Sequence, residues 1–249
     1  MTIHPALQNA LDRAHTLKII SGLNNFNAER VAAVVKAADR GGATFVDIAA
    51  DPNLVRMAKQ LTRLPVCVSA VDPELLVAAV NAGADLIEIG NFDSFYAQGR
   101  RFEAVEVLAL THATRALLPT ITLSVTVPHI LPLDQQVHLA ETLVKAGADI
   151  IQTEGGTSSA PAHSGSLGLI EKAAPTLAAA YEIARAIEIP VLCASGLSSV
   201  TAPLAIAAGA SGIGVGSAIN QLNSEVAMVA AVRSLVEALA TVNRAKVSV

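Results

Sequence analysis

Four ionisable side chains lie within or directly after short apolar segments of this 249-residue chain. A charge in such a segment is costly unless it is paired or used in chemistry, because burial removes its hydration. Burial can lower the pKa of a lysine until it acts as a base or a Schiff-base nucleophile, with a carboxylate as proton-transfer partner. We therefore predict acid–base catalysis without a metal ion. The candidate catalytic residues are Lys18, Asp47, Glu88 and Glu154.

Two other roles for Lys18 stay open. Its ammonium could form a structural ion pair with Asp47 or Glu88 that only fills the protein interior. It could also anchor a ligand without taking part in chemistry. The residue types alone do not decide among the three roles.

Glycines gather in the segment SGIGVGSAI, residues 211–219, which is otherwise apolar enough to be a buried strand. Glycine weakens a strand, so either close packing or the close approach of a ligand to the backbone must explain these residues. A second turn, ASGLSS at residues 194–199, has a similar composition. Bare backbone N–H groups at the start of a helix bind anions. We predict a phosphate site formed by Ser195, Gly196, Gly216 and Ser217, with Gly155 and Gly156 beside them.

A repeated phrase indicates which elements position these residues. It reads GGATFVDI from residue 41, AGADLIEI from 82, AGADIIQT from 146 and AGASGIGV from 208. Each copy follows an Ala/Val-rich helical pattern, so its glycine predicts a helix end and its apolar run a buried parallel strand. Four further strand-like runs begin near residues 17, 64, 117 and 189. Eight strands alternating with helices predict an α/β fold, a (β/α)8 TIM barrel forming one domain over residues 1–249, with an open doubly wound sheet as the alternative.

Alignment of the four repeats predicts where the acids point. The residues at one shared position of the repeat are Asp47, Glu88, Gln152 and Gly214. Glu154 lies two residues after Gln152, and Gly216 lies two residues after Gly214. Because side chains on one face of a strand recur every second residue, these positions share a face. Helices cover the outer face of a barrel, so we expect the acids inside, near the C-terminal mouth where barrel active sites lie. Helices are expected to start at Asp51-Pro52 and Asp72-Pro73.

Composition narrows the class of partner. Hydrophobic residues make up 52% of the chain, charged residues 15%, and the mean hydropathy is +0.51, which indicates a large buried core. A net charge of −4 without a Lys/Arg cluster argues against binding of nucleic acid or of an anionic membrane. No apolar run approaches the roughly 18 residues of a membrane span, and no signal peptide pattern precedes the first helix, so we expect a cytoplasmic protein. Cys67 and Cys193 lack metal-site or disulfide spacing and are expected to be buried thiols.

Polar loop segments are expected at the mouth of the barrel. The fifteen residues EGGTSSAPAHSGSLG contain His163, which could be a general acid on a closing lid or an exposed histidine. Asn24, Asn25, Asn91 and Asp93 are candidate contacts for ligand hydroxyl groups. Arg100 and Arg101 could bind an anion or remain solvated, and Tyr96 could pack or stack.

These motifs carry two resemblances. The stretch from AGADIIQTEGG through IPVLCASGL to AGASGIGVGSAI resembles the phosphate-binding half of the ribulose-phosphate-binding, aldolase-type barrels, which include thiazole synthase and N-acetylmannosamine-6-phosphate epimerase. The whole chain, with KIISGLNNFNAERV, FVDIAADP and IEIGNFDSFYAQG, resembles the cyanobacterial and plastid family of hypothetical chloroplast reading frame 23. That resemblance implies a photosynthetic source, and the plastid stroma for a plastid-encoded chain. The epimerase pattern needs a lysine on a central strand, whereas Lys18 lies on the first and only Glu154 fits its acid.

Together these features predict a barrel that binds a small phosphorylated metabolite and acts as an isomerase, epimerase or lyase by proton abstraction beside a carbonyl. A non-catalytic sensor or degenerate barrel that keeps only the phosphate grip is the alternative. No cofactor is expected, and an FMN enzyme is a further alternative because flavin phosphate uses the same corner of such barrels. Assembly into a homo-oligomer is left open.

Overall fold

Eight parallel strands close into a barrel in chain order, because β1 pairs with β8 as well as with β2. The computed structural model describes residues 3–96, 98–155 and 159–242. The pairing of the first strand with the last excludes an open sheet, so the predicted (β/α)8 barrel is confirmed. The strands are β1 (Thr16–Ile20), β2 (Phe45–Ala49), β3 (Val66–Ala70), β4 (Leu86–Ile89), β5 (Thr122–Thr126), β6 (Ile150–Gln152), β7 (Val191–Ala194) and β8 (Gly212–Val215).

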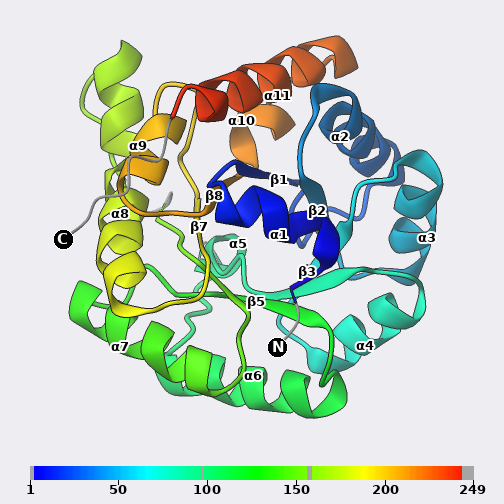
Figure 1. The fold of residues 1–249 in the computed structure, drawn as a ribbon. Helices are drawn as coiled ribbons and strands as arrows, with labels where there is room; N and C mark the ends of the chain where they lie inside the picture. Colours follow the sequence, from blue (N-terminus) through cyan, green and yellow to red (C-terminus); the bar gives the residue numbers. More distant parts are fainter. Residues whose placement is uncertain (1–2, 97, 156–158, 243–249) are drawn as a thin grey trace.

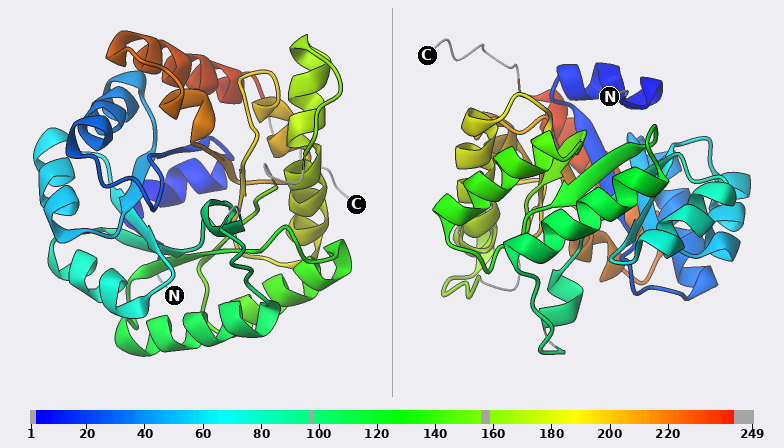
Figure 2. Two further views of the ribbon diagram at one scale, coloured as in Figure 1. Left: turned by 180° about the vertical axis from the view of Figure 1, so that it is seen from behind. Right: turned by 90° about the horizontal axis from the view of Figure 1, so that it is seen from below.

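Helices surround the barrel as an outer ring (Figures 1 and 2). The ring consists of α2 (Ala28–Gly41), α3 (Pro52–Leu61), α4 (Pro73–Asn81), α6 (Ala104–Leu117), α7 (Leu133–Lys145), α8 (Gly165–Ala186), α9 (Ala202–Ala207) and α11 (Glu225–Ala240). Three further helices lie at the barrel ends: α1 (Pro5–Asp12), α5 (Asp93–Tyr96) and α10 (Ser217–Asn220).

The predicted helix starts are confirmed by their caps. The Asp51 carboxylate accepts hydrogen bonds from the N–H groups of Asn53 and Leu54, at 2.8 and 2.9 Å, at the start of α3. Asp72 accepts from the N–H of Glu74 at 2.9 Å at the start of α4. Each acid satisfies backbone donors that have no partner inside the helix, and the proline that follows it has no N–H to satisfy.

Helix α1 closes the N-terminal end of the barrel (Figure 1). Its Leu7 and Leu11 are buried in one cluster with the inward-facing side chains near the start of five strands. Those strand residues are Phe45, Cys67, Leu86, Ile150 and Leu192. Figure 2 shows α1 at one end of the barrel and the segment around α5, in teal, at the other. Among the described residues α1 thus covers the N-terminal end, which leaves the C-terminal end for the approach of a ligand.

Both cysteines are buried free thiols, as predicted. Burial raises the pKa of Cys67 well above its ordinary value, and the Asp47 carboxylate adds to this effect. Burial likewise raises the pKa of Cys193 to about 11. Since the thiolate is the reactive form, neither thiol is a nucleophile at neutral pH.

Truncation of the closing helix tests its part in the core. We expect Leu11→Ala to lower the free energy of unfolding by about 2–4 kcal/mol, because it removes a side chain that is 1% exposed and leaves a cavity. Urea denaturation followed by circular dichroism measures this. The matched control is Leu75→Ala on α4, where the side chain is 48% exposed and the expected loss is below about 0.5 kcal/mol. Equal losses in the two variants would contradict a closed, packed barrel end.

Candidate functional site

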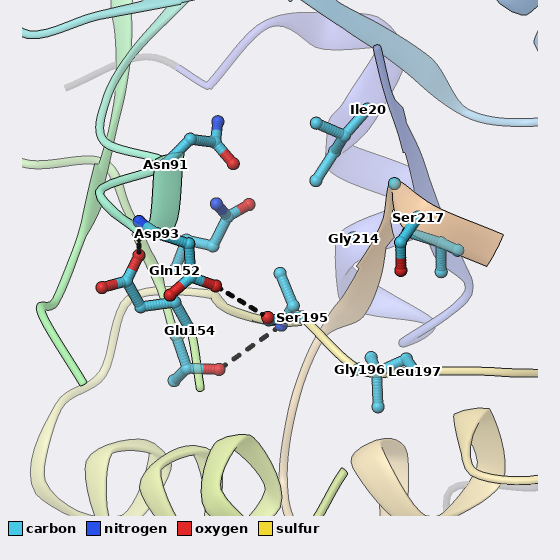
Figure 3. A pocket seen from close by; sticks show the side chains of 14 residues that line it. Ile20, Asn91, Asp93, Gln152, Glu154, Ser195, Gly196, Leu197, Gly214 and Ser217 are labelled. Atoms are coloured by element: carbon cyan, nitrogen blue, oxygen red, sulfur yellow. Dashed lines mark hydrogen bonds between the residues drawn. The ribbon is translucent and has the colours of Figure 1, made fainter. Parts of the chain in front are cut away.

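A cavity of about 190 Å³ opens at the C-terminal mouth of the barrel (Figure 3). Residues at the ends of β1, β4, β6, β7 and β8 form its wall. Figure 3 shows Gly196 and Ser217 on one side of the cavity and the polar side chains of Asn91, Gln152 and Glu154 on the other. Asp93, Ser195 and Gly216 also line it. The fold thus brings four of the six predicted phosphate residues to one cavity with Glu154.

The remaining two predicted phosphate residues do not line this cavity. Gly155 is buried beside α8, where a Cβ atom would lie 3.0 Å from the side chain of Pro175 and from the backbone N of Thr176. Gly155 is therefore needed for close packing. Gly156 lies outside the described residues.

The turn after β7 holds two residues in the left-handed backbone region. Gly196 has φ +72°, and a Cβ atom there would lie 2.6 Å from the carbonyl oxygen of Lys172, so only glycine fits. Ser195 has φ +78°, which is uncommon for a residue with a side chain. Its Oγ donates a hydrogen bond to Asp93 Oδ2 at 3.0 Å (Figure 3). Strain of this kind is retained where the surrounding structure requires it, as at binding sites.

The three glycines of SGIGVGSAI have different roles. A Cβ atom on Gly212 would lie 2.4 Å from Thr16 Cβ, and one on Gly214 would lie 2.9 Å from Ala194 Cβ. Those two glycines permit close packing inside the barrel. A Cβ atom on Gly216 would find no atom nearer than 3.4 Å, and this residue borders the cavity. Packing thus explains the first two glycines, and access to the cavity explains the third.

The short helix α10 is fixed against β1 at the edge of the cavity. Asn220 Nδ2 donates to the carbonyl oxygen of Ile20 at 2.8 Å, and Arg30 donates to the carbonyl oxygen of Asn220. The first N–H groups of a helix have no acceptor inside it, and here they belong to Ser217 and Ala218. These donors are held beside Gly216 by a rigid attachment.

Of the four predicted catalytic residues, Glu154 lines the cavity, and it is 4% exposed. Its Oε1 accepts hydrogen bonds from the Tyr96 hydroxyl at 2.7 Å and from the backbone N–H of His129 at 3.2 Å. Its Oε2 accepts from the Asp93 N–H at 3.4 Å. Burial raises the pKa of Glu154 to about 8, with the Asp93 charge adding to the effect and the hydrogen bond from Tyr96 opposing it. A carboxyl that titrates near neutral pH suits proton transfer.

His129 and Tyr96 complete this acid–base cluster. His129 Nε2 lies 2.8 Å from Asp93 Oδ1, and the rings of His129 and Tyr96 pack edge to face at 5.1 Å. Burial lowers the pKa of His129, but its hydrogen bond to Asp93 and the charge of Glu154 outweigh burial, so the pKa is raised. Burial and then Glu154 raise the pKa of Tyr96, so its phenol stays protonated and donates.

Sequence analysis missed His129. The signal was available, because His129 follows the strand pattern LSVTV and so lies at the C-terminal end of a predicted strand. Tyr96 was expected to pack or stack, and the structure adds its hydrogen bond to Glu154. Asp93 was expected to contact ligand hydroxyl groups, and it also links His129 to Ser195.

Within the part of the chain that the structure describes, Asp93, His129 and Glu154 form the one trio of metal-ligand types whose atoms all lie within 4.8 Å of one another. Several of these atoms already pair with one another, with Tyr96 or with backbone N–H groups. An acid–base network accounts for these contacts without a cation. The expectation of no metal site stays a prediction.

Lys18, Asp47 and Glu88 face the barrel interior but do not line the cavity, and all three are 0% exposed. Lys18 Nζ lies 2.6 Å from Glu88 Oε2 and 3.8 Å from Asp47 Oδ2. Gln152 separates them from the cavity: its Oε1 accepts from Lys18 at 3.0 Å, and its Nε2 donates to Glu88 at 2.9 Å. Hydroxyl groups of Ser69 and Ser124 donate to Asp47 and Glu88, at 2.6 and 2.8 Å. We call Lys18, Asp47, Glu88, Ser69, Ser124 and Gln152 the buried ionic network.

The expectation of a lowered pKa for Lys18 is wrong. Burial acts in that direction, but the charges of Asp47 and Glu88 outweigh it and raise the pKa, so the amine stays protonated. Burial raises the pKa of Asp47 to about 6, against the attraction of Lys18. This geometry fits the structural ion pair, which was the alternative role for Lys18.

The other loop residues lie outside the cavity wall. His163 is exposed and its Nδ1 lies 2.5 Å from Glu171 Oε1, which agrees with an exposed histidine. Arg100 is exposed, pairs with Glu106, and lies 4.4 Å from the centre of the Phe102 ring. Arg101 is also exposed. None of the described helices is both long and apolar enough to cross a lipid bilayer.

Comparison with known proteins places the chain in a family and in a fold group. A protein of Cyanophora paradoxa named "Uncharacterized protein ycf23" is 48% identical over 224 residues, covering 90% of this chain and 92% of that protein. The predicted resemblance to hypothetical chloroplast reading frame 23 is therefore confirmed.

Two solved structures share the barrel. The thiamine phosphate pyrophosphorylase of Pyrococcus furiosus has a TM-score of 0.59 and 20% identity, covering 92% of this chain and 98% of its own. The (S)-3-O-geranylgeranylglyceryl phosphate synthase of Thermoplasma acidophilum has a TM-score of 0.61 and 16% identity, covering 96% and 100%. At these identities the likeness shows the fold. The match of residues 3–245 to the family described as "Protein of unknown function (DUF561)", together with the ycf23 relative, shows that the chain belongs to this family.

Proposed function

We propose that the chain binds a small phosphorylated metabolite in the cavity at the mouth of the barrel and moves a proton beside its carbonyl group. One observation carries the proposal: Gly196 and Ser217 lie across the cavity from Glu154, whose carboxyl is buried, and Gly216, next to Ser217 in the chain, also lines the cavity. The small residues let a phosphate approach the backbone N–H groups, and the helix start at Ser217 favours an anion. The reactive end of the ligand then lies against Glu154.

In this proposal Glu154 is the catalytic base. Its carboxylate takes a proton from the hydroxyl-bearing carbon beside the carbonyl and returns it to the former carbonyl carbon, while the hydroxyl proton moves to the carbonyl oxygen through water, which is isomerisation. Delivery of a proton from water to the opposite face of the first carbon is epimerisation. The pKa of about 8 keeps the carboxyl close to both protonation states at neutral pH. Tyr96 and His129 hold the carboxyl in place through its Oε1 atom. Lys18, Asp47 and Glu88 lie deeper in the barrel. Lys18 and Glu88 hold the Gln152 amide in place through hydrogen bonds.

The fold neighbours support a phosphorylated ligand. The Thermoplasma acidophilum enzyme was solved in complex with its substrate sn-glycerol-1-phosphate, and the Pyrococcus furiosus enzyme is named for thiamine phosphate. The cavity volume of about 190 Å³ accommodates a phosphate group and a few carbons. The absence of a cofactor, the cytoplasmic or stromal location and the homo-oligomer stay predictions.

A ligand screen followed by isotope exchange tests the function. Phosphorylated sugars and related metabolites are added at about a hundred times a typical Kd, where binding to the native state raises the melting temperature by roughly 5–10 °C. Each hit is then incubated in deuterated water, and exchange at the carbon beside its carbonyl is followed by NMR. Binding with exchange is the expected result. Binding without exchange indicates the non-catalytic sensor, and a screen without any hit contradicts the proposal.

A charge variant locates the phosphate. We expect Ser217→Asp to abolish the shift caused by every hit, since it adds a negative charge where the dianion binds. Ser224→Asp is the matched control, because Ser224 is the exposed N-cap residue of α11, away from the cavity wall, and aspartate is a good cap. If Ser217→Asp still binds the hits, the phosphate group does not bind at Ser217.

A further inference from the structure

A second cavity, of about 400 Å³, adjoins the first and shares Asn91 and Asp93 with it. Its other polar lining side chains carry only hydroxyl or amide groups: Ser21, Asn24, Asn25 and Ser94. Among the described residues that line it, none is a lysine or an arginine. This chemistry suits an uncharged, hydroxylated group and gives no attraction to a second phosphate.

Asn91 lies at the boundary between the two cavities, and its amide nitrogen contacts the buried ionic network. Nδ2 lies 3.1 Å from Glu88 Oε1, 3.2 Å from Ser69 Oγ and 3.5 Å from Asp47 Oδ2. An ionised carboxylate only accepts hydrogen bonds, so the NH2 group must face the buried ionic network. Lys18 strengthens this orientation, because its ammonium donates a hydrogen bond to Glu88 Oε2 at 2.6 Å and so holds the acceptor side of that carboxyl in place.

The backbone of Asn91 is fixed as well. It has φ +62°, in the left-handed region that asparagine tolerates better than most residues. The Ser94 hydroxyl donates to the Asn91 carbonyl oxygen at 2.8 Å. Both ends of the residue are therefore held, and the side chain has one orientation.

The consequence is an acceptor that the protein leaves unused. Within the described residues no group donates to Asn91 Oδ1. Figure 3 shows the Asn91 side chain reaching from its wall into the first cavity, toward Ile20. Its neighbour Asp93 is 26% exposed and also offers carboxylate oxygens at this boundary. Acceptors at this point attract hydroxyl donors and repel a phosphate.

We propose that Asn91 is a specificity-determining residue: its Oδ1 accepts a hydrogen bond from a hydroxyl group of the ligand, whose hydroxylated end extends into the second cavity. This rests on the proposed function, since the phosphate must lie at Gly196 and Ser217 for the other end to reach Asn91. The buried ionic network then has a role in binding, because it decides which face of the Asn91 amide meets the ligand. The selected class is a phosphate ester with a polyhydroxylated chain.

Two probes of similar length test the proposal: ribitol 5-phosphate, which carries hydroxyl groups along its chain, and n-pentyl phosphate, which carries none. Isothermal titration calorimetry gives Kd for each with the wild-type chain and with Asn91→Gly, which accepts φ +62° and lacks the amide. We expect the wild type to prefer ribitol 5-phosphate by about tenfold or more, and Asn91→Gly to lose about 3- to 10-fold of that preference while its Kd for pentyl phosphate changes little.

Each outcome is decisive. An equal loss of affinity for both probes in Asn91→Gly, or an unchanged ratio, overturns the role of Asn91 but leaves the phosphate site standing. Binding of neither probe by the wild type overturns the proposed function itself. If Asn91→Gly does not fold, the wild-type ratio still decides, because pentyl phosphate binding as tightly as ribitol 5-phosphate overturns selection for hydroxyl groups.

Discussion

Turnover by Glu154→Gln is expected to fall about 10²- to 10⁴-fold, the usual contribution of a positioned general base. Glutamine has the same shape and can still accept the hydrogen bond that Tyr96 gives to Glu154, but it cannot take a proton. Exchange of the ligand proton in deuterated water measures the loss. Affinity for the ligand should change far less than the exchange rate, because the substitution leaves the proposed phosphate site at Ser217 unchanged.

The pH dependence of the wild type identifies the same group. Since the carboxylate is the active form of a base, the exchange rate should rise with pH and level off above about 8, the raised pKa of Glu154. The residual activity of Glu154→Gln should lack this rise.

The pH dependence of the free energy of unfolding tests the raised pKa of Glu154 independently of catalysis. Between the ordinary value of 4.5 and about 8, folded Glu154 keeps a proton that the unfolded chain releases. Glu154 therefore makes the wild type lose stability as pH rises through this range, on the order of 4 kcal/mol, and Glu154→Gln lacks this part of the loss. Urea unfolding at pH 5 and pH 9 measures the difference. Glu171→Gln is the control, because Glu171 lies on α8 beside exposed His163. Parallel pH curves for wild type and Glu154→Gln would contradict a buried, titrating Glu154.

The second large effect concerns the buried ionic network. Lys18→Met is expected to lower the free energy of unfolding by about 3–5 kcal/mol, because it leaves Glu88 and Asp47 buried without their cation. Methionine nearly conserves volume, so the loss reports charge rather than packing. Guanidinium denaturation at pH 7 measures it, and Lys59→Met is the control. Lys59 pairs with Asp85 at 2.7 Å but is 37% exposed, and such surface pairs contribute about 0–1 kcal/mol.

A compensating variant separates charge from misfolding. Lys18→Met combined with Glu88→Gln and Asp47→Asn removes the cation and both anions, so it should recover much of the stability lost in Lys18→Met. It should not recover selection for hydroxyl groups at Asn91, because neutral amides no longer require its NH2 group to face them. If Lys18→Met is as stable as the wild type, the three charges are not coupled as their distances indicate.

The barrel was predictable because the information is local. Each copy of the phrase at residues 41, 82, 146 and 208 joins a helix end to a buried strand within eight residues, so the element order could be read directly. The strand period of two also predicted that Glu88 and Glu154 face inward. The alternation of side chains along a strand does not show how far along the barrel axis a residue lies. That position distinguishes Glu154, which lines the cavity, from Glu88, which lies in the buried ionic network.

The role of Lys18 was less predictable because a pKa depends on distances across the barrel. Residues 18, 47 and 88 belong to three strands, and Lys18 Nζ lies 2.6 Å from Glu88 only after closure. The partners of Glu154 were hidden for a related reason. Tyr96 lies on the four-residue helix α5 and His129 in the loop after β5, segments too short for any periodicity to define, so the sequence offered only their position after β4 and β5.

Helix α1 closes one end of the barrel, and the cavity opens at the other end. With Leu7 and Leu11 filling the far end, a ligand has to leave by the route through which it arrived. Product release and substrate binding must therefore use the same entrance, so product has to leave before the next substrate molecule can bind.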